Sequence, residues 1–173
     1  PYSFIQYQIA ILEKDLEKAS KIFKSIPDDF NEKIINFLEK FGYNELSYSI
    51  TKNQNQKFSL ALKLQKLDDS MEIAKKENNQ EKLKLVADLA LELGEFSIAE
   101  AAMKQANDYS GLLLFYSSTQ NRDKLKSLAE ETKEKGVFNI SFSSFFQLND
   151  IDNCLALLVD AKRYPEAGIF CRT

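Results

Sequence analysis

The sequence has no histidine and no tryptophan, and its 173 residues include only 5 glycines, 3 prolines and 2 cysteines. Without histidine, a Ser-His-Asp or Cys-His nucleophile pair, a histidine-bound metal ion and imidazole acid–base catalysis are all excluded. The glycines are dispersed and form no GxxxxGKS/T or GxGxxG phosphate loop. Adjacent acidic residues such as Asp68 and Asp69 point in different directions on a helix and do not face a common substrate. We therefore expect no enzymatic activity, no catalytic residue, no metal site and no cofactor.

The chain also lacks a basic excess, because 23 lysines and arginines stand against 26 acidic residues, for a net charge of -3. Its densest basic stretches, at Lys75-Lys76 and at Lys82 and Lys84, have glutamates beside them. We expect these stretches to be solvated, charge-mixed helix faces. The charge pattern therefore predicts no nucleic-acid partner and no phosphate or lipid patch.

No apolar run approaches the roughly 18 residues that cross a bilayer, and the start of the chain lacks the layout of a signal peptide. We therefore expect no direct membrane insertion and a reducing, cytosolic setting. Cys154 and Cys171 lie within apolar helical patterns without a close ligand pair, so both should be small core residues. The first residue, Pro1, and the end at Thr173 indicate a segment cut from a longer protein.

Leucine occurs 22 times and valine only 3 times, which favours helices over strands. Gly42, Gly94 and Gly136 each follow an apolar or basic stretch, as glycines do when they end a helix in the left-handed conformation. Asp29 with Glu32, and Asn78 with Glu81, have the spacing of a capping box at a helix start. These signals divide the chain into about 13 short helices, most of them near 13 residues long.

A weak internal repeat runs through the chain: an apolar residue, a small residue three positions later and an apolar residue seven positions after the first. It predicts that the second helices of successive hairpins begin near residues 16, 43, 67, 96, 122 and 151, with a further copy half a period later. The full copies are Leu16, Ala19 and Phe23; Leu67, Ser70 and Ala74; Phe96, Ala99 and Met103; Ile151, Cys154 and Leu158; and Tyr164, Ala167 and Cys171.

A small residue at a fixed helix position lets a neighbouring helix pack closely, as in solenoids. We therefore predict an all-α fold, a TPR-like, right-handed α-solenoid of stacked antiparallel helical hairpins, in one segment over residues 1–173 with a loose connection at 51–57. The leucine-rich residues 82–93 should be a sandwiched helix, and residues 112–116 a buried first helix. Residues Phe138, Phe142, Phe145 and Phe146 should form one core stripe.

Two stretches carry a resemblance to a known family. Residues 82–131 read KLKLVADLALELGEFSIAEAAMKQANDYSGLLLFYSSTQNRDKLKSLAEE, and residues 163–173 read RYPEAGIFCRT. Both resemble the helical region of the beta-prime subunit family of coatomer, the COPI vesicle coat, and residues 37–43 and 58–68 are similar more loosely. Cys171 and Gly168 depart from the family pattern and put local packing in question.

The resemblance implies an α-solenoid that follows two WD-repeat propellers and joins the coatomer alpha subunit and other coatomer subunits. It implies a cytoplasmic location, peripheral on Golgi and COPI vesicle membranes, in Golgi-to-ER and intra-Golgi transport. Dilysine cargo signals are bound by the propellers in that family, so no cargo-binding residue is assigned to this chain, and the sequence names no partner-contact position. Two alternatives stay open: an independent helical-repeat adaptor with a basic or Asn-lined groove for peptide tails, and a solenoid of another propeller-plus-solenoid subunit, from ciliary transport or a membrane tether.

Overall fold

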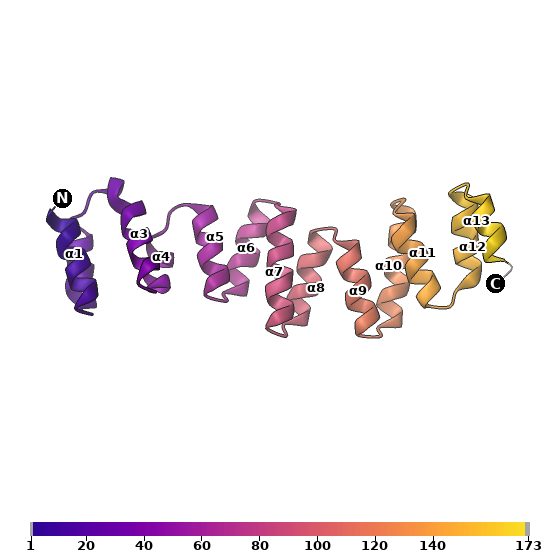
Figure 1. The fold of residues 1–173 in the computed structure, drawn as a ribbon, viewed down its shortest axis with the longest axis horizontal. Coiled ribbons are helices and arrows are strands. Elements are labelled where there is room, and N and C mark those ends of the chain that lie inside the picture. Colours follow the sequence, from indigo (N-terminus) through magenta and orange to yellow (C-terminus); the bar gives the residue numbers. More distant parts are fainter. Residues whose placement is uncertain (1, 172–173) are drawn as a thin grey trace. The chain divides into compact units, whose positions relative to one another are not determined.

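Short antiparallel helices follow one another along the chain in the computed structural model, which describes residues 2–171 (Figure 1). Within these residues there are 13 α-helices, one 3-10 helix and no strand, as predicted for an all-α, TPR-like fold. The helices have 7 to 13 residues and most have 10, so they are shorter than the 13 residues expected from the sequence. The chain divides into two compact units, one up to Glu77 and one from Asn78 onward.

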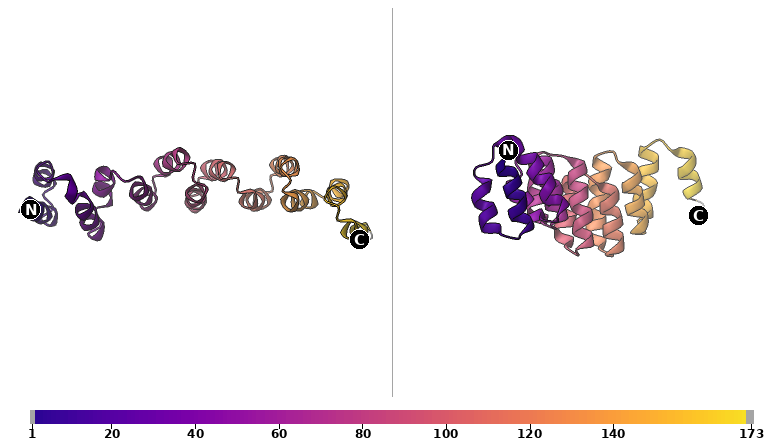
Figure 2. Two further views of the ribbon diagram at one scale, coloured as in Figure 1. Left: turned by 90° about the horizontal axis from the view of Figure 1, so that it is seen from above. Right: turned by 60° about the vertical axis from the view of Figure 1, so that its left-hand side comes forward.

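The first unit holds α1 to α6 and the second α7 to α13, and the left view of Figure 2 shows the helices of each unit nearly end-on. The helices of the first unit are α1 (Tyr2–Leu12), α2 (Leu16–Phe23), the 3-10 helix η1 (Asp28–Phe30), α3 (Asn31–Lys40), α4 (Asn44–Ile50), α5 (Gln54–Lys63) and α6 (Leu67–Lys76). Those of the second are α7 (Gln80–Glu92), α8 (Phe96–Gln105), α9 (Tyr109–Ser118), α10 (Arg122–Glu134), α11 (Phe138–Gln147), α12 (Ile151–Asp160) and α13 (Tyr164–Phe170).

The predicted starts of the second helices are confirmed at residues 16, 67, 96, 122 and 151, and the remaining one lies at Asn44 in place of residue 43. The small residue is the fourth residue of the helix in each full copy, and it is buried in all of them. In α4 this place belongs to Ser47, which the sequence pattern missed because the helix begins one residue later. Ser47 Oγ donates to the carbonyl of Ile35 on α3 at 3.4 Å. The close approach of the two helices is therefore visible in a side chain-to-backbone hydrogen bond.

Most helix-to-helix junctions share one backbone geometry. At nine junctions within the described residues, the helix is followed by a residue with positive φ. The N–H of this residue donates to the carbonyl three residues before it, and the N–H of the next residue donates to the carbonyl five residues before itself. At Gly136, for example, the N–H of Gly136 donates to the carbonyl of Lys133 at 3.1 Å, and the N–H of Val137 donates to the carbonyl of Thr132 at 2.8 Å. This is the Schellman ending, and the residue after it is already the N-cap residue of the next helix. The nine positive-φ residues are Lys14, Gly42, Gln65, Gly94, Asn107, Gln120, Gly136, Asn149 and Lys162.

Both predicted capping boxes are wrong in detail. Asp29 lies inside η1, and α3 has Phe30 as its N-cap residue without a side-chain cap, because the turn after Pro27 continues directly into the helix. At the second position Asn79, not Asn78, caps α7, and its Oδ1 accepts the N–H groups of Glu81 and Lys82 at 3.0 and 3.2 Å. Asn78 has φ of 47° and belongs to the turn that ends α6.

The loose connection predicted at residues 51–57 is only three residues long. Thr51 is buried and its Oγ1 donates to the carbonyl of Ser47 at 2.6 Å. Asn53 caps α5 by accepting the N–H of Asn55 at 2.9 Å, so the polar residues from Gln54 onward form the first turn of a helix. Asparagine at an N-cap starts a helix despite polar neighbours, because it satisfies backbone groups that lack intrahelical partners.

Several apolar stretches are less fully buried than expected. Phe145 is buried and Phe142 partly buried, but Phe138 is exposed and Phe146 is 56% exposed, so the four phenylalanines are not one core stripe. In the same way Leu112 and Tyr116 are buried while Leu114 is 72% exposed. On α7, Leu83, Val86 and Ala87 are buried but Leu85 is 51% exposed. A helix packed on two sides still has a third side open to solvent. Cys154 is buried as predicted, whereas Cys171 is exposed.

Candidate functional site

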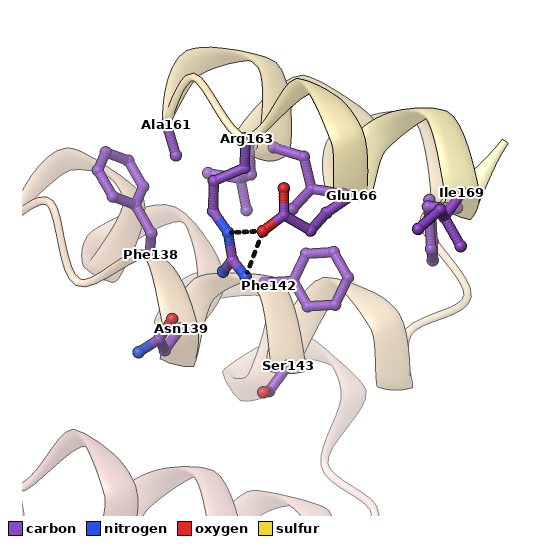
Figure 3. Close-up of a pocket in the computed structure, with 11 residues that line it drawn as sticks. Phe138, Asn139, Phe142, Ser143, Ala161, Arg163, Glu166 and Ile169 are labelled. Carbon is purple, nitrogen blue, oxygen red and sulfur yellow. Dashed lines mark hydrogen bonds and ion pairs between the residues drawn. The ribbon is translucent and has the colours of Figure 1, made fainter.

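A groove of about 540 Å³ lies among α11, α12 and α13 of the second unit (Figure 3). Apolar side chains form most of its lining, and the rings of Phe142 and Phe170 meet edge to face at 5.6 Å between centroids. The residues that line it are Phe138, Asn139, Phe142, Ser143, Leu157, Leu158, Ala161, Arg163, Glu166, Ile169 and Phe170. Such a lining suits apolar side chains of a ligand or a partner.

The charged groups of this groove are paired with each other. Arg163, the N-cap residue of α13, donates from Nε and Nη2 to Glu166 Oε1, each at 3.0 Å. Figure 3 shows the guanidinium turned toward this carboxylate. A backbone hydrogen bond at Glu166 and the bond from Arg163 lower the pKa of the Glu166 carboxyl. The groove therefore holds a carboxylate that stays ionised and an arginine that is already engaged by it.

A second groove, of about 440 Å³, lies in the first unit among α1, α2, α3 and α4. Tyr7, Ile11, Phe23 and Leu46 contribute apolar surface to it. At its rim the Lys52 ammonium contacts Asp28 Oδ2 at 2.9 Å, and this hydrogen bond and charge lower the pKa of the Asp28 carboxyl. As in the first groove, the lining is apolar and the charged groups at its rim form an ion pair with each other.

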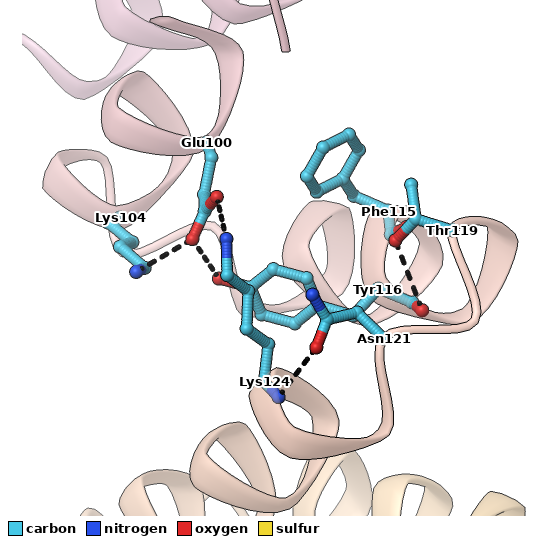
Figure 4. A network of polar contacts seen from close by, with 7 residues as sticks. All are labelled: Glu100, Lys104, Phe115, Tyr116, Thr119, Asn121 and Lys124. Carbon is cyan, nitrogen blue, oxygen red and sulfur yellow. Dashed lines mark hydrogen bonds and ion pairs between the residues drawn. The ribbon is translucent and has the colours of Figure 1, made fainter. Parts of the chain in front are cut away.

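Glu100 on α8 is the centre of a network of polar contacts (Figure 4). Its carboxylate accepts Lys104 Nζ at 2.8 Å, Lys124 Nζ of α10 at 2.5 Å and the hydroxyl of Tyr116 of α9 at 2.9 Å. The Glu100 side chain is only 14% exposed. Burial alone would raise its pKa, but the three hydrogen bonds outweigh burial and lower the pKa from 4.5 to about 2. Burial and the bond to Glu100 raise the pKa of Tyr116.

The Glu100 cluster connects three consecutive helices. Because all three donors end on one carboxylate, moving any one helix breaks a charge-assisted hydrogen bond. A second cluster in the first unit has the same design: Tyr48 of α4 donates to Asp69 Oδ2 of α6 at 2.8 Å, and Lys66 binds Glu45 at 2.8 Å with its ammonium 4.5 Å from the Tyr48 ring centroid. Burial and the bond to Asp69 raise the pKa of Tyr48 to about 12. These clusters hold helices together and present no activated nucleophile or base.

The polar contacts between hairpins follow the repeat spacing. Lys63 binds Glu39 at 2.9 Å across 24 residues, and Lys124 binds Glu100 across the same separation. Sequence reasoning named no site residue and missed these pairs, although a glutamate followed by a lysine 24 positions later is a signal that a search at the repeat period could have found. Among the described residues no group of histidine, cysteine and acidic side chains has the arrangement of a metal site. None of the described helices has the length and apolar character needed to traverse a bilayer.

The chain is a helical-repeat protein. Its hairpins repeat, its junctions share one backbone geometry, and many of its polar side chains bind between neighbouring helices. The sequence comparisons give the particular family. The COPA/B TPR domain family matches residues 7–173, and the chain belongs to that family.

Its relatives include coatomer beta' subunits of several species. Coatomer subunit beta'-2 of Arabidopsis thaliana is 37% identical over 171 residues, coatomer subunit beta' of Homo sapiens 32% and coatomer subunit beta' of Drosophila melanogaster 31%. Each comparison covers 99% of this chain but only 18 or 19% of the relative. The chain therefore spans about a fifth of the length of the curated relatives it matches.

Proposed function

We propose that this chain is a structural segment of a vesicle coat, the helical scaffold of a coatomer beta-prime subunit, and that it assembles with other coatomer subunits. The observation that carries the proposal is the family match over residues 7–173, together with beta' relatives that cover 99% of the chain. The partner we propose is the alpha subunit, through contact between helical repeats. The proposed location is cytoplasmic and peripheral on Golgi and COPI vesicle membranes.

The distribution of polar and apolar groups supports a scaffold. Charged side chains such as Glu100 and Lys124 are engaged between helices, so they tie neighbouring helices together. Large apolar side chains, in contrast, lie open to solvent on α11 and α13, with Phe146 and Ile169 more than half exposed. Exposed apolar surface beside ordered helices is typical of protein–protein contact sites.

The proposal is tested by mixing the chain with the helical-repeat domain of the alpha subunit and measuring a complex by co-elution and calorimetry. We expect a complex of one chain with one partner, weakened at least tenfold by Ile169→Glu, which places a charge in the α11–α13 groove. Leu114→Glu is the matched control, because it adds the same charge at an exposed apolar position outside this groove. Failure of the unaltered chain to form a complex would refute contact through this segment.

One observation favours a second function, the peptide-tail adaptor: Asn139 and Arg163 both line the α11–α13 groove. A terminal carboxylate would have to displace Glu166 from Arg163. An adaptor should therefore bind C-terminal peptides more tightly in the Glu166→Gln variant, whereas a scaffold should bind them in neither form. Fluorescence anisotropy with short labelled peptides distinguishes the two functions.

A further inference from the structure

Tyr7 of α1 is a buried tyrosine whose hydroxyl has no hydrogen-bond partner among the described residues. It is only 3% exposed. The other described tyrosines that are buried or partly buried all donate a hydrogen bond, and these are Tyr43, Tyr48, Tyr109 and Tyr116. A hydroxyl that leaves water without gaining a partner costs free energy. Tyr7 therefore carries a hydrogen-bonding group that its own chain does not use.

The Tyr7 hydroxyl belongs to the groove of about 440 Å³ in the first unit, which Tyr7 lines. Among the described residues, every fully buried side-chain nitrogen or oxygen has a partner, so the Tyr7 hydroxyl keeps some accessible surface. The Tyr7 ring lies 6.0 Å, between centroids, from the ring of Phe23, which lines the same groove. Burial raises the pKa of Tyr7, so the hydroxyl stays protonated and able to donate at neutral pH.

The rest of this groove, which we call the α1–α4 groove, is mainly apolar and uncharged. The large apolar side chains in its lining are Ile11, Leu16, Phe23, Leu46 and Ile50. Its charged side chains, Asp28 and Lys52, pair with each other at 2.9 Å and are 80% and 73% exposed, so they lie at the mouth. A volume of about 440 Å³ falls within the roughly 300–1,000 Å³ of small-molecule pockets. Apolar walls with one inner polar group suit an uncharged molecule of that size.

We propose that the α1–α4 groove binds a small, uncharged organic molecule with an apolar body and one hydrogen-bond acceptor, which accepts from the Tyr7 hydroxyl. A ketone, ester or alcohol oxygen meets this requirement. The apolar body removes the walls from water, and the acceptor supplies the partner that the hydroxyl lacks. A carboxylate is a poorer ligand, because it would have to displace Asp28 from Lys52. This site is independent of the proposed contact with the alpha subunit, whose test uses the groove of the second unit.

Fluorescence titration with prodan tests the proposal. Prodan is an uncharged naphthalene with one ketone, and its emission moves to the blue in apolar surroundings. Addition of the chain should shift this emission with a dissociation constant on the order of 100 µM, as expected for a ligand of this size in an open groove. An emission that stays unchanged up to millimolar concentrations of the chain overturns the proposal.

The role of the hydroxyl is tested by Tyr7→Phe, which should weaken prodan binding about fivefold through the loss of one hydrogen bond. Because this hydroxyl has no partner in the chain, the urea midpoint of the variant should be unchanged. Tyr43→Phe is the matched control, since the Tyr43 hydroxyl donates to the Ile11 carbonyl at 3.3 Å and Tyr43 is not part of the groove lining. It should lower the urea midpoint and leave binding unchanged. Equal binding by Tyr7→Phe and the unaltered chain overturns the proposal.

The position of the ligand is tested by Leu16→Glu, which places a charge on the wall at a residue that is 51% exposed. This variant should weaken prodan binding about fivefold or more, because a charge beside the ligand would have to be desolvated. Leu114→Glu adds the same charge at an exposed position of the second unit and should have no effect. Unchanged binding by Leu16→Glu would place the probe elsewhere and contradict the proposal.

The charge of the ligand is tested by competition for bound prodan. Octanol should displace prodan, and octanoate at the same concentration should displace much less of it. Stronger displacement by octanoate would assign recognition to Lys52 and contradict an uncharged ligand.

Discussion

Replacing Glu100 with glutamine removes one negative charge while keeping nearly the same shape, and it should destabilise the second unit strongly. Lowering the pKa from 4.5 to about 2 corresponds to about 3 kcal/mol of stabilisation at neutral pH. Lys104 and Lys124 are about half exposed, so solvent screens part of this effect. We therefore expect Glu100→Gln to lower the free energy of unfolding at pH 7 by about 2 kcal/mol.

The pH dependence gives a sharper test of the same cluster. Because the folded pKa of Glu100 is depressed, its stabilisation is fully present above about pH 5 and is lost as the pH falls toward 2. The unaltered chain and Glu100→Gln should therefore differ most at pH 7, by less than half as much at pH 3, and hardly at all at pH 2. Urea denaturation at these three pH values, followed by circular dichroism, measures the difference directly.

A matched control is Glu72→Gln, which removes the carboxylate from a pair with Lys76 in which both side chains are well exposed. An exposed pair of this type contributes at most about 0.5 kcal/mol, so this variant should be nearly neutral. If Glu100→Gln were as stable as the unaltered chain at pH 7, or if its loss relative to that chain were the same at pH 2, the assignment of Glu100 as the charged centre of three helices would be refuted.

Three further predictions follow from the packing, the junctions and the first-unit cluster. Ala99, the fourth residue of α8, is fully buried where a neighbouring helix packs closely, so Ala99→Leu should lower the free energy of unfolding by about 2 kcal/mol or more, as measured by urea denaturation. An unchanged urea midpoint would contradict close packing at this position. Gln120 has a φ of 53°, which is unfavourable for a residue with a side chain, so Gln120→Gly should stabilise the chain by about 0.5 kcal/mol and raise the thermal midpoint modestly. A lower midpoint would show that Gln120 is not strained. Tyr48 should titrate near pH 12 by tyrosinate absorbance, so its contribution to stability holds to about pH 10 and is lost as the pH rises toward 12. Tyr48→Phe should reduce this loss, and a normal Tyr48 titration near pH 10 would contradict the partly buried hydrogen bond to Asp69.

The helical repeat was largely predictable because it is carried by local signals. A small residue such as Ala99 or Cys154 at the same place in the second helices of several hairpins indicated the hairpin period, and the three junction glycines marked helix ends. The other junctions escaped prediction because residues such as Gln65 and Lys162 have no preference for the left-handed conformation. At these junctions the backbone hydrogen bonds of the Schellman ending and the packing of the flanking helices outweigh the preference of the residue for negative φ.

The sequence pattern did not predict which residues form the candidate contact surfaces, and the reason differs from that for the junctions. Phe145 and Phe146 are adjacent and chemically identical, yet one is buried and the other is 56% exposed, because neighbouring helices cover only part of α11. The Glu100 cluster likewise joins residues from three helices, and nothing in the sequence distinguishes Lys124 or Tyr116 from the other lysines and tyrosines of the chain. Which side of a helix is covered depends on the rotation of each hairpin, which local signals do not encode.

The shared ending at nine junctions bears on how the chain folds during synthesis. Each turn is closed by hydrogen bonds that span at most five residues, so a junction can form as soon as its own helix end leaves the ribosome. Contacts that are mostly between neighbouring helices favour fast, stepwise folding within each unit, since no distant segment has to be awaited. A hairpin can thus be docked on its predecessor before its successor has been translated.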